Sequence, residues 1–261
     1  MTAAVFERSG DLFVPTACAT GPWGADRLHG GPVLGLLARA FEAAVDPQLV
    51  CARLTVDMFR PVPHAALGVR CEVVRKGARL TALQASLFAE QTELARASAL
   101  FLRESEIHAS VHSQPPAGFE NLPVESLIRG FRDPNVPKGF HTRVETRWVP
   151  RTGSEPLAIW FRLPMQLVAA ETASPLQRAV ALSDFANAVS SIADNLLQRR
   201  VVPYINTDAT LYLSRRPEGE WFCLRQSDHE AERGISVAGV AIADQRGPLG
   251  SVHQARLAVL R

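Results

Sequence analysis

Two polar residues have types and positions that suit chemistry on a water molecule. Asp184 lies in the mostly helical stretch 174–199 and is interpreted as a helix start, where an aspartate can cap free backbone amides or can orient or deprotonate water. Gln254 lies in a strand that otherwise reads as apolar. Its amide can donate to a water or an oxyanion while accepting from a neighbour, although structural pairing or surface exposure explains it equally well.

A glycine-rich turn, His29-Gly30-Gly31-Pro32, precedes the first predicted helix. Glycines at a helix start allow another backbone or ligand to approach closely, and the first turn of a helix offers free N–H groups. These N–H groups can polarise a carbonyl oxygen. The alternative is a tight turn packed under a sheet, with His29 in a structural or exposed position.

Other kinds of chemistry have little support in the sequence. Gly234-Ile235-Ser236-Val237-Ala238-Gly239 is one residue too long for a nucleophile elbow, and no dinucleotide, Walker or H-E-x-x-H motif occurs. The four cysteines lack the spacing of a zinc site, and we expect free, mostly buried thiols. We therefore expect no metal and no redox cofactor.

Charge and hydropathy limit the partners. The 261 residues carry 28 Lys and Arg against 26 Asp and Glu, so a net charge of +2 gives no reason to expect nucleic acid or an anionic membrane as a partner. No apolar run approaches the ~20 residues that span a bilayer. Glu7 and Asp11 stand where a signal peptide would be apolar, which predicts a cytoplasmic protein.

The elements that must position these residues occur in two similar sets. In the first, a helix over 32–45 is followed by strands over 49–62, 66–77, 78–90 and 94–104. In the second, strands over 141–150 and 156–164 and a helix over 174–199 precede strands over 202–215, 220–230, 234–244 and 249–261. The pattern predicts halves at 1–105 and 141–261, joined by a connecting segment at 106–140 and folded as one compact unit.

The two sets read as an internal repeat. Ala89-Glu90-Gln91 matches Ala243-Asp244-Gln245 at an offset of 154, and the ending ALFLR (99–103) matches LAVLR (257–261) at an offset of 158. At an offset of 153, Gly31 stands where Asp184 stands. The halves therefore diverged at this position, and only the second has a carboxylate there.

These motifs resemble a known family. HGGP (29–32) followed by LLARAF, TVDMFRPVP (55–63) and ARASALFLR (95–103) are similar to the acyl-CoA thioesterases related to bacterial thioesterase II. The resemblance covers nearly the whole chain. It implies an α+β double hotdog fold, in which each of two tandem repeats wraps an antiparallel sheet around a long central helix.

The resemblance also implies a site and a reaction. In this family a carboxylate, a hydroxyl or amide residue and a glutamine hold the attacking water, and these positions match Asp184, either Asn206 or Thr207, and Gln254. The turn residues His29, Gly30 and Gly31 would contact the substrate. The implied function is hydrolysis of acyl-CoA to free acid and CoA without a cofactor. Besides the acyl-CoA substrate, the partner considered is another copy of the same chain in a homo-oligomer.

Two rival functions stay open on the same fold. One is a non-catalytic protein that binds acyl-CoA or lipid, since fold does not fix function. The other is a structural module whose tunnel has collapsed.

Overall fold

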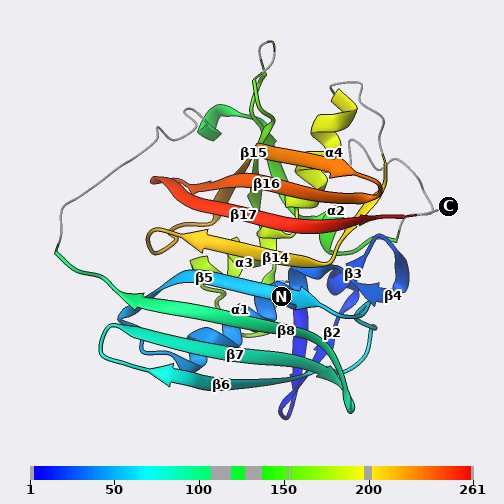
Figure 1. The fold of residues 1–261 in the computed structure, drawn as a ribbon. Coiled ribbons are helices and arrows are strands. Elements are labelled where there is room, and N and C mark those ends of the chain that lie inside the picture. Colours follow the sequence, from blue (N-terminus) through cyan, green and yellow to red (C-terminus); the bar gives the residue numbers. More distant parts are fainter. Residues whose placement is uncertain are drawn as a thin grey trace.

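The structure is a computed structural model that describes residues 3–106, 119–126, 137–151, 153, 155–196 and 202–259. Its main feature is one antiparallel sheet to which twelve strands of the described residues contribute (Figure 1). The order along the sheet is β6-β7-β8-β5-β14-β17-β16-β15-β11-β10-β9, and β13 pairs with β17 beside β14. Strands from the first half of the chain occupy one end and strands from the second half the other.

The first half contributes four strands, as the sequence predicts, but the first of them, β5, pairs with β8 and not with its successor β6, so the four strands are not a simple meander. They are β5 (Leu49–Met58), β6 (Gly68–Lys76), β7 (Leu80–Ala89) and β8 (Thr92–Arg103). The second half contributes β9 (Glu125–Ser126), β10 (Glu145–Trp148), β11 (Ala158–Arg162), β13 (Tyr204–Asn206), β14 (Asp208–Leu213), β15 (Trp221–Glu232), β16 (Ile235–Asp244) and β17 (Gly247–Ala258).

The two halves join at the pair β5 and β14. Their residues pair antiparallel from Asp208↔Asp57 to Tyr212↔Arg53, so the hydrogen-bonded ladder continues from one half to the other. Each of these strands would be an unpaired edge without the other half.

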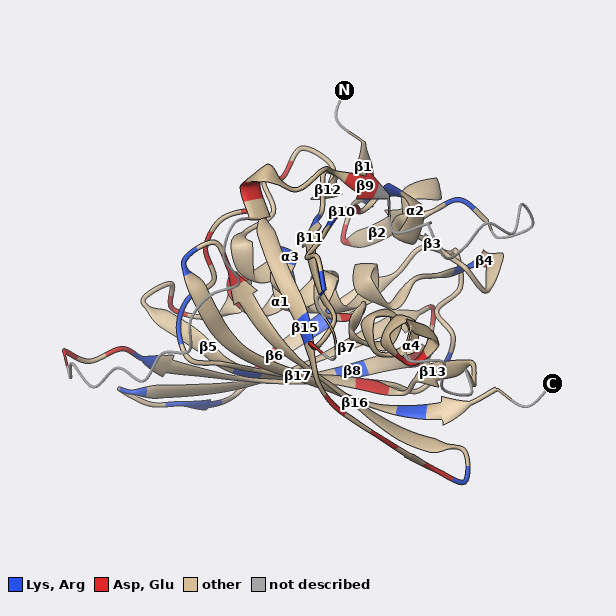
Figure 2. Cartoon of the chain, turned by 90° about the horizontal axis from the view of Figure 1, so that it is seen from above, with Lys and Arg blue, Asp and Glu red and all other residues tan. Residues whose placement is uncertain are grey.

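The helices lie on one face of this sheet, as Figure 2 shows from above. They are α1 (Gly30–Ala44), α2 (Phe140–Arg143), α3 (Pro175–Ser183) and α4 (Ala186–Leu196). The packing of α1 on β6 and β7 corresponds to that of α4 on β15 and β16, and α3 packs against α1. Alternate residues of β14 and β17 are buried under the helices, as expected for a sheet covered on one face.

Close packing explains the glycine inside α1. A Cβ added to Gly35 would lie 3.1 Å from Ala181 Cβ and 3.1 Å from Leu167 Cδ1. The small residue therefore lets α3 and the strand β12 (Gln166–Val168) approach α1. The sequence predicts packing against a flat surface here, and the structure shows a helix and a strand instead.

Four expectations about the elements need correction. The helix expected over 174–199 is broken at Asp184 and Phe185 into α3 and α4, with residues 197–199 outside the described residues. The strand expected over 202–215 is interrupted at Thr207. The strand expected over 141–150 begins with α2. Part of the expected connecting segment, β9, pairs with β10 in the sheet.

The N-terminal strands were not predicted from the sequence. They are β1 (Ala4–Ser9), β2 (Leu12–Pro15), β3 (Thr20–Gly21) and β4 (Gly24–Leu28). A small second sheet has the order β12-β1-β2, in which β1 pairs parallel with β12 of the other half. β1 pairs with the next strand, β2, and β3 with β4, so only the pairing of β1 with β12 joins segments that are far apart in the sequence.

We predict that neither half folds alone. A fragment of residues 1–105 would expose the β5 edge and the face of α1 that α3 covers, so it should be insoluble or lack a cooperative melting transition. Circular dichroism during heating, with the full chain as control, measures this. A monomeric fragment that melts cooperatively would contradict the prediction.

Candidate active site

The Asp184 carboxylate lies at the junction of α3 and α4, facing the start of α1. Asn206 Nδ2 donates to its Oδ1 at 2.7 Å, and His29 Nδ1 lies 2.8 Å from its Oδ2. Asp184 is 7% exposed, so this charge is almost entirely removed from water. The site therefore combines α1 of the first half with the helix junction and β13 of the second.

The break in the helix is what directs the carboxylate toward α1. Phe185 N–H donates to Leu182 O and Val189 N–H to Phe185 O, so α4 starts anew after the turn. No proline or glycine occurs in Leu182-Ser183-Asp184-Phe185, so helix propensity gives no sign of the break. The partners of the carboxylate come from α1 and β13, and a cap of its own helix is therefore not needed to explain Asp184.

Glycine is required where α1 meets Asp184. A Cβ at Gly30 would lie 2.6 Å from Asp184 Oδ1 and 2.7 Å from Oδ2, well inside contact distance. A Cβ at Gly31 would lie 2.6 Å from both Ala181 O and Phe140 Cε1. The turn thus brings the positive end of the α1 dipole and its free N–H groups against a buried carboxylate.

His29 is the N-cap residue of α1, and its ring also contacts the Asp184 carboxylate. The Gly31 N–H lies 3.1 Å from His29 Nδ1. A ring nitrogen that donates its hydrogen to the carboxylate cannot also accept, and the Gly31 N–H bonds to the Asp184 carboxylate as well. His29, assigned from the sequence to substrate contact, therefore also holds the carboxylate in place.

Opposing effects set the acidity of Asp184. Burial by itself raises the pKa of a carboxyl group, because the charged form loses its water. The charge and hydrogen bond of His29, with bonds from Asn206 and the Gly31 N–H, outweigh burial and hold the pKa of Asp184 below its ordinary value. The group is therefore an ionised carboxylate at neutral pH.

The structure distinguishes Asn206 from Thr207. Asn206 touches the carboxylate, whereas Thr207 is exposed and its Oγ1 donates to Ala255 O at 3.1 Å. The amide therefore occupies the position beside Asp184, and Thr207 lies outside the cluster.

Gln254 is the other amide of the cluster. It is fully buried on β17, and its Nε2 donates to the Asp184 backbone carbonyl at 3.4 Å. Its Oε1 is buried without a hydrogen-bond partner among the described residues. A buried acceptor of this kind needs a donor, and a water molecule can supply one.

Aromatic rings surround the histidine and the carboxylate. The His29 ring has its centroid 5.1 Å from both Phe140 and Phe185, and it stacks on His141 at 5.9 Å. Burial, and then the charge of His29, lowers the pKa of His141 to about 4, so this ring is neutral at physiological pH. Phe140 and His141 belong to α2, and no pattern in the sequence indicates that this segment lies beside the turn at His29.

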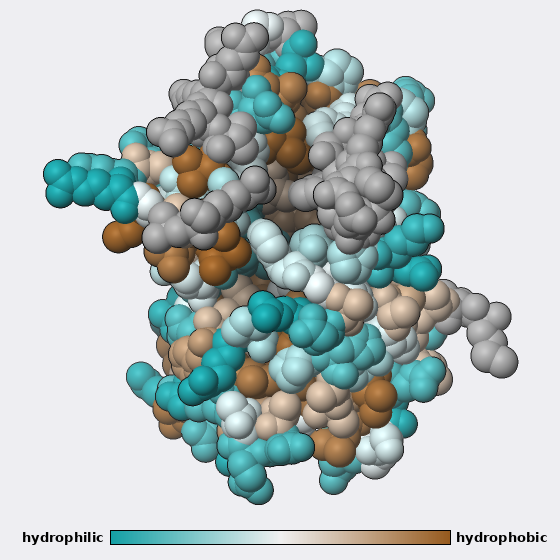
Figure 3. Space-filling view, turned by 90° about the vertical axis from the view of Figure 1, so that its right-hand side faces the viewer, coloured by the Kyte–Doolittle hydropathy of each residue, from teal (hydrophilic) through white to brown (hydrophobic). Residues whose placement is uncertain are grey.

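Figure 3 shows the face of the molecule that carries α2, β3 and β4. Apolar residues lie at the base of a hollow in this face.

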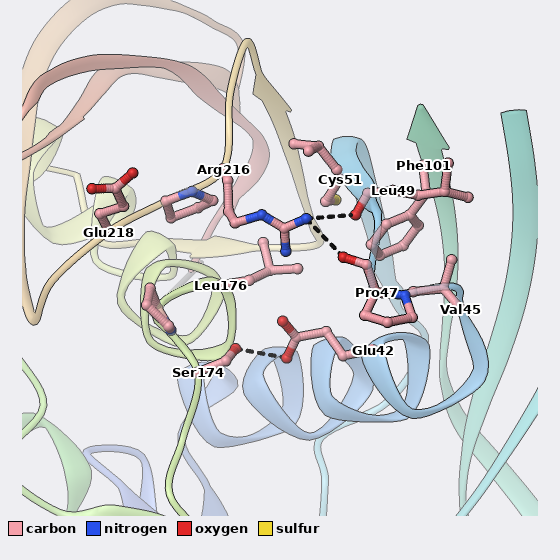
Figure 4. A pocket seen from close by; sticks show the side chains of 13 residues that line it. Glu42, Val45, Pro47, Leu49, Cys51, Phe101, Ser174, Leu176, Arg216 and Glu218 are labelled. Atoms are coloured by element: carbon pink, nitrogen blue, oxygen red, sulfur yellow. Dashed lines mark hydrogen bonds between the residues drawn. The ribbon is translucent and has the colours of Figure 1, made fainter. Parts of the chain in front are cut away.

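A separate pocket of about 310 Å³ lies at the opposite end of α1, between Glu42 and Leu176 (Figure 4). There Arg216 Nη2 donates to the carbonyl oxygens of Pro47 and Leu49. None of the residues predicted for the site lines this pocket, which is therefore distinct from the Asp184 cluster.

Metal ligands and thiols give no second site in the described part of the chain. No three His, Cys, Asp or Glu side chains there are grouped to hold a metal ion. All four cysteines are free thiols, and burial, followed by the charge of Glu42, raises the pKa of Cys51 to about 12. Among the described residues, no helix is long and apolar enough to cross a membrane.

Comparison with solved structures defines the fold. A candidate thioesterase II from Thermobifida fusca is 18% identical, with a TM-score of 0.71 over 98% of this chain and 95% of that one. Acyl-CoA thioesterase II TesB2 from Mycobacterium marinum is 19% identical, with a TM-score of 0.68 over 98% and 96%. A hotdog-fold protein from Alicyclobacillus acidocaldarius is 16% identical, with a TM-score of 0.69 over 98% and 96%. The chain has the hotdog fold.

Sequence profiles give the family. The profile of the acyl-CoA thioesterase N-terminal domain matches residues 19–102, and that of the acyl-CoA thioesterase C-terminal domain matches residues 112–258. No curated protein matches the sequence closely enough to be significant. The chain belongs to the acyl-CoA thioesterase family, as its motifs predict.

We predict that Gly30→Ala removes activity. The added methyl group must displace the Asp184 carboxylate or the start of α1, and a displacement of ~1 Å typically costs ~100-fold in rate. The measurement is turnover of acyl-CoA at saturating substrate. Gly68→Ala is the matched control, since its Cβ would meet only Leu12 Cδ2 at 3.8 Å. Equal activity in the two variants would contradict the close approach.

Proposed function

We propose that this acyl-CoA thioesterase hydrolyses its substrate at the Asp184 cluster. In this reaction water attacks the thioester carbonyl, the carbon–sulfur bond breaks, and a free acid and CoA leave. The observation that carries the proposal is the ionised, buried carboxylate of Asp184 together with the unpartnered Oε1 of Gln254, whose Nε2 contacts the Asp184 backbone carbonyl. Together they offer two acceptors for the two hydrogens of one water molecule.

In the proposed mechanism Asp184 acts as the general base. Its carboxylate takes a proton from the water as the oxygen attacks the carbonyl carbon, and Gln254 Oε1 accepts the other hydrogen and orients the water. His29 and Asn206 hold the carboxylate while leaving it further lone pairs, because two carboxylate oxygens accept about four hydrogen bonds. The proton gained by Asp184 is then available to the departing CoA sulfur.

The start of α1 is suited to the developing negative charge. The N–H groups of the first helical turn have no acceptor within the helix, and the helix dipole favours an anion there. The Gly31 N–H is used by the Asp184 carboxylate, so a carbonyl oxygen placed at the turn would be polarised by the other N–H groups of the first helical turn. Removal of one such donor typically costs ~10²–10³-fold in kcat. We assign substrate contact to this turn on that basis.

Further features of the proposal concern the whole chain. We propose that the two packings of α1 and α4 on the shared sheet form a double hotdog, with halves at 1–105 and 141–261 and the connection at 106–140. The similar packing of both helices supports it. A role in fatty acid metabolism follows from the substrate class. The cytoplasmic location and the homo-oligomer stay predictions.

The main test is Asp184→Asn. The change removes the charge but keeps the size of the side chain, and an amide can donate to or accept from the His29 ring. We predict a folded protein that loses at least ~100-fold in kcat, measured by release of free thiol from acyl-CoA. Gln254→Ala should lose less. A variant that still binds acyl-CoA and keeps wild-type turnover would exclude this carboxylate as the base.

A pair of neighbouring substitutions tests the geometry of the site. Asn206→Ala removes a hydrogen bond to a charged group, typically worth about 1.5–3 kcal/mol, so we predict a fall of ~10-fold or more in kcat. Thr207→Ala, on the exposed neighbour, should stay within about twofold of wild type. The same thiol-release assay compares them, and a larger loss in Thr207→Ala would mean that the hydroxyl, and not the amide, serves the reaction.

A further inference from the structure

A second buried polar cluster lies beside the Asp184 site, with Arg256 at its centre. Arg256 is on β17 and is 2% exposed. Its Nη2 lies 2.6 Å from His229 Nε2 and donates to Ser236 Oγ at 2.7 Å. A buried guanidinium needs partners of this kind, because an unpaired charge in the interior is costly.

The direction of these hydrogen bonds can be assigned. A guanidinium only donates, so His229 Nε2 must accept and the ring hydrogen is carried by Nδ1. Nδ1 lies 2.9 Å from Asp194 Oδ2 on α4. A continuous chain of donors therefore runs from Arg256 on β17 through His229 on β15 to Asp194 on α4.

The same guanidinium also contacts two other segments. Its Nη1 donates to Asn187 Oδ1 at 3.1 Å, and its carbon lies 4.8 Å from the centre of the Tyr204 ring. Asn187 Nδ2 in turn donates to Tyr204 O at 3.1 Å. Arg256, Asn187 and Tyr204 thus form a closed triangle between β17, the first turn of α4, and β13.

Each corner of this triangle is two or three residues from a member of the proposed site. Asn187 follows Asp184 by three residues, and Tyr204 precedes Asn206 by two. Gln254 precedes Arg256 by two residues, and both side chains point to the buried face of β17. The three segments that carry the three polar groups of the site are therefore tied together by one side chain.

We propose that Arg256 is a positioning residue for the hydrolysis, which fixes Asp184, Asn206 and Gln254 relative to one another. The inference rests on the proposed function of the Asp184 cluster. Arg256 does not touch the carboxylate, and its effect is carried by the backbones of α4, β13 and β17. The planar fork of arginine suits the role, because several bonds in fixed directions are needed, and a lysine cannot reproduce them.

The chain offers a matched control. Arg215 is also a largely buried arginine of the second half, and it binds the fully buried Asp244 through Nη1 at 2.8 Å and Nη2 at 2.6 Å. Its other bonds go to the carbonyl oxygens of Pro248, Arg216 and Gly247. Gly247 and Pro248 stand at the start of β17, six or more residues before Gln254, and none of these groups lies on α4 or β13. Arg215→Lys therefore measures the general effect of losing a buried arginine fork.

The experiment compares Arg256→Lys and Arg215→Lys by kcat and KM for acyl-CoA, below the melting temperature of both. We expect Arg256→Lys to lose ~10-fold or more in kcat with KM within about threefold, since small misplacements of reacting groups act on rate. Arg215→Lys should keep kcat within about twofold. A kcat within twofold of wild type in Arg256→Lys, or equal losses in both variants, would overturn the proposal.

A double variant separates positioning from stability. If Arg256 acts through the site, the double variant with Arg256→Lys and Asn206→Ala should have a higher kcat than the product of the two single losses predicts. The reason is that both changes disturb the same arrangement of residues. Multiplicative effects would count against the inference. If Arg256→Lys does not fold, Asn187→Ala replaces it, and unchanged kcat in that variant has the same consequence.

The outcomes also separate this inference from the proposed function. Full activity in Asp184→Asn would exclude the general base itself, whatever Arg256 does. Lost activity in Asp184→Asn together with full activity in Arg256→Lys would overturn only the positioning role.

Discussion

The structure around the site depends on one buried charge, the carboxylate of Asp184. An ion taken out of water is costly unless charge and hydrogen bonds replace the lost water, and removal of one partner leaves the other uncompensated. His29, Asn206 and the N–H groups at the start of α1 supply this replacement. The absence of a side chain at Gly30 follows, because the helix end must come within contact distance of the carboxylate.

That constraint also explains why the two halves form one unit. The carboxylate comes from the second half and the helix end from the first, so neither half satisfies the charge alone. The ladder between β5 and β14 and the parallel pair of β1 and β12 hold the halves in register. At the offset seen in the sequence Gly31 and Asp184 are equivalent, and in the structure these equivalent positions meet. A perfectly symmetric repeat would place the same residue at both positions. Here one position is a glycine and the other a carboxylate, so the contact between them forms a single site.

The halves differ in what lies between helix and sheet. The face of α1 toward the sheet is apolar, with Val33, Leu37 and Phe41 buried. The space beneath α4 holds Asp194 and Arg256 instead. Buried polar groups give less stability than well-packed apolar ones, but they fix relative positions when all are bonded. The network around Arg256 lies next to a site that is proposed to hold a water molecule. It is therefore consistent with a role in fixing the positions of the residues of that site.

The sequence alone determined the elements with strong local patterns and the residues whose types suit the reaction. The helix at 32–45 and most strands of both halves could be predicted, and Asp184 and Gln254 could be singled out as candidates, because periodicity, turns and chemical type are local properties. The order of the strands is not a simple meander in either half, since β5 and β14 pair with each other and with the last strand of their own half. The tertiary structure decided the break at Asp184, the choice of Asn206 over Thr207, the parallel pairing of β1, and the partnership of His29 with Asp184. Each of these depends on contacts between residues far apart in the chain: the helix breaks where a buried carboxylate gains partners on α1 and β13, and no local pattern encodes where those partners lie.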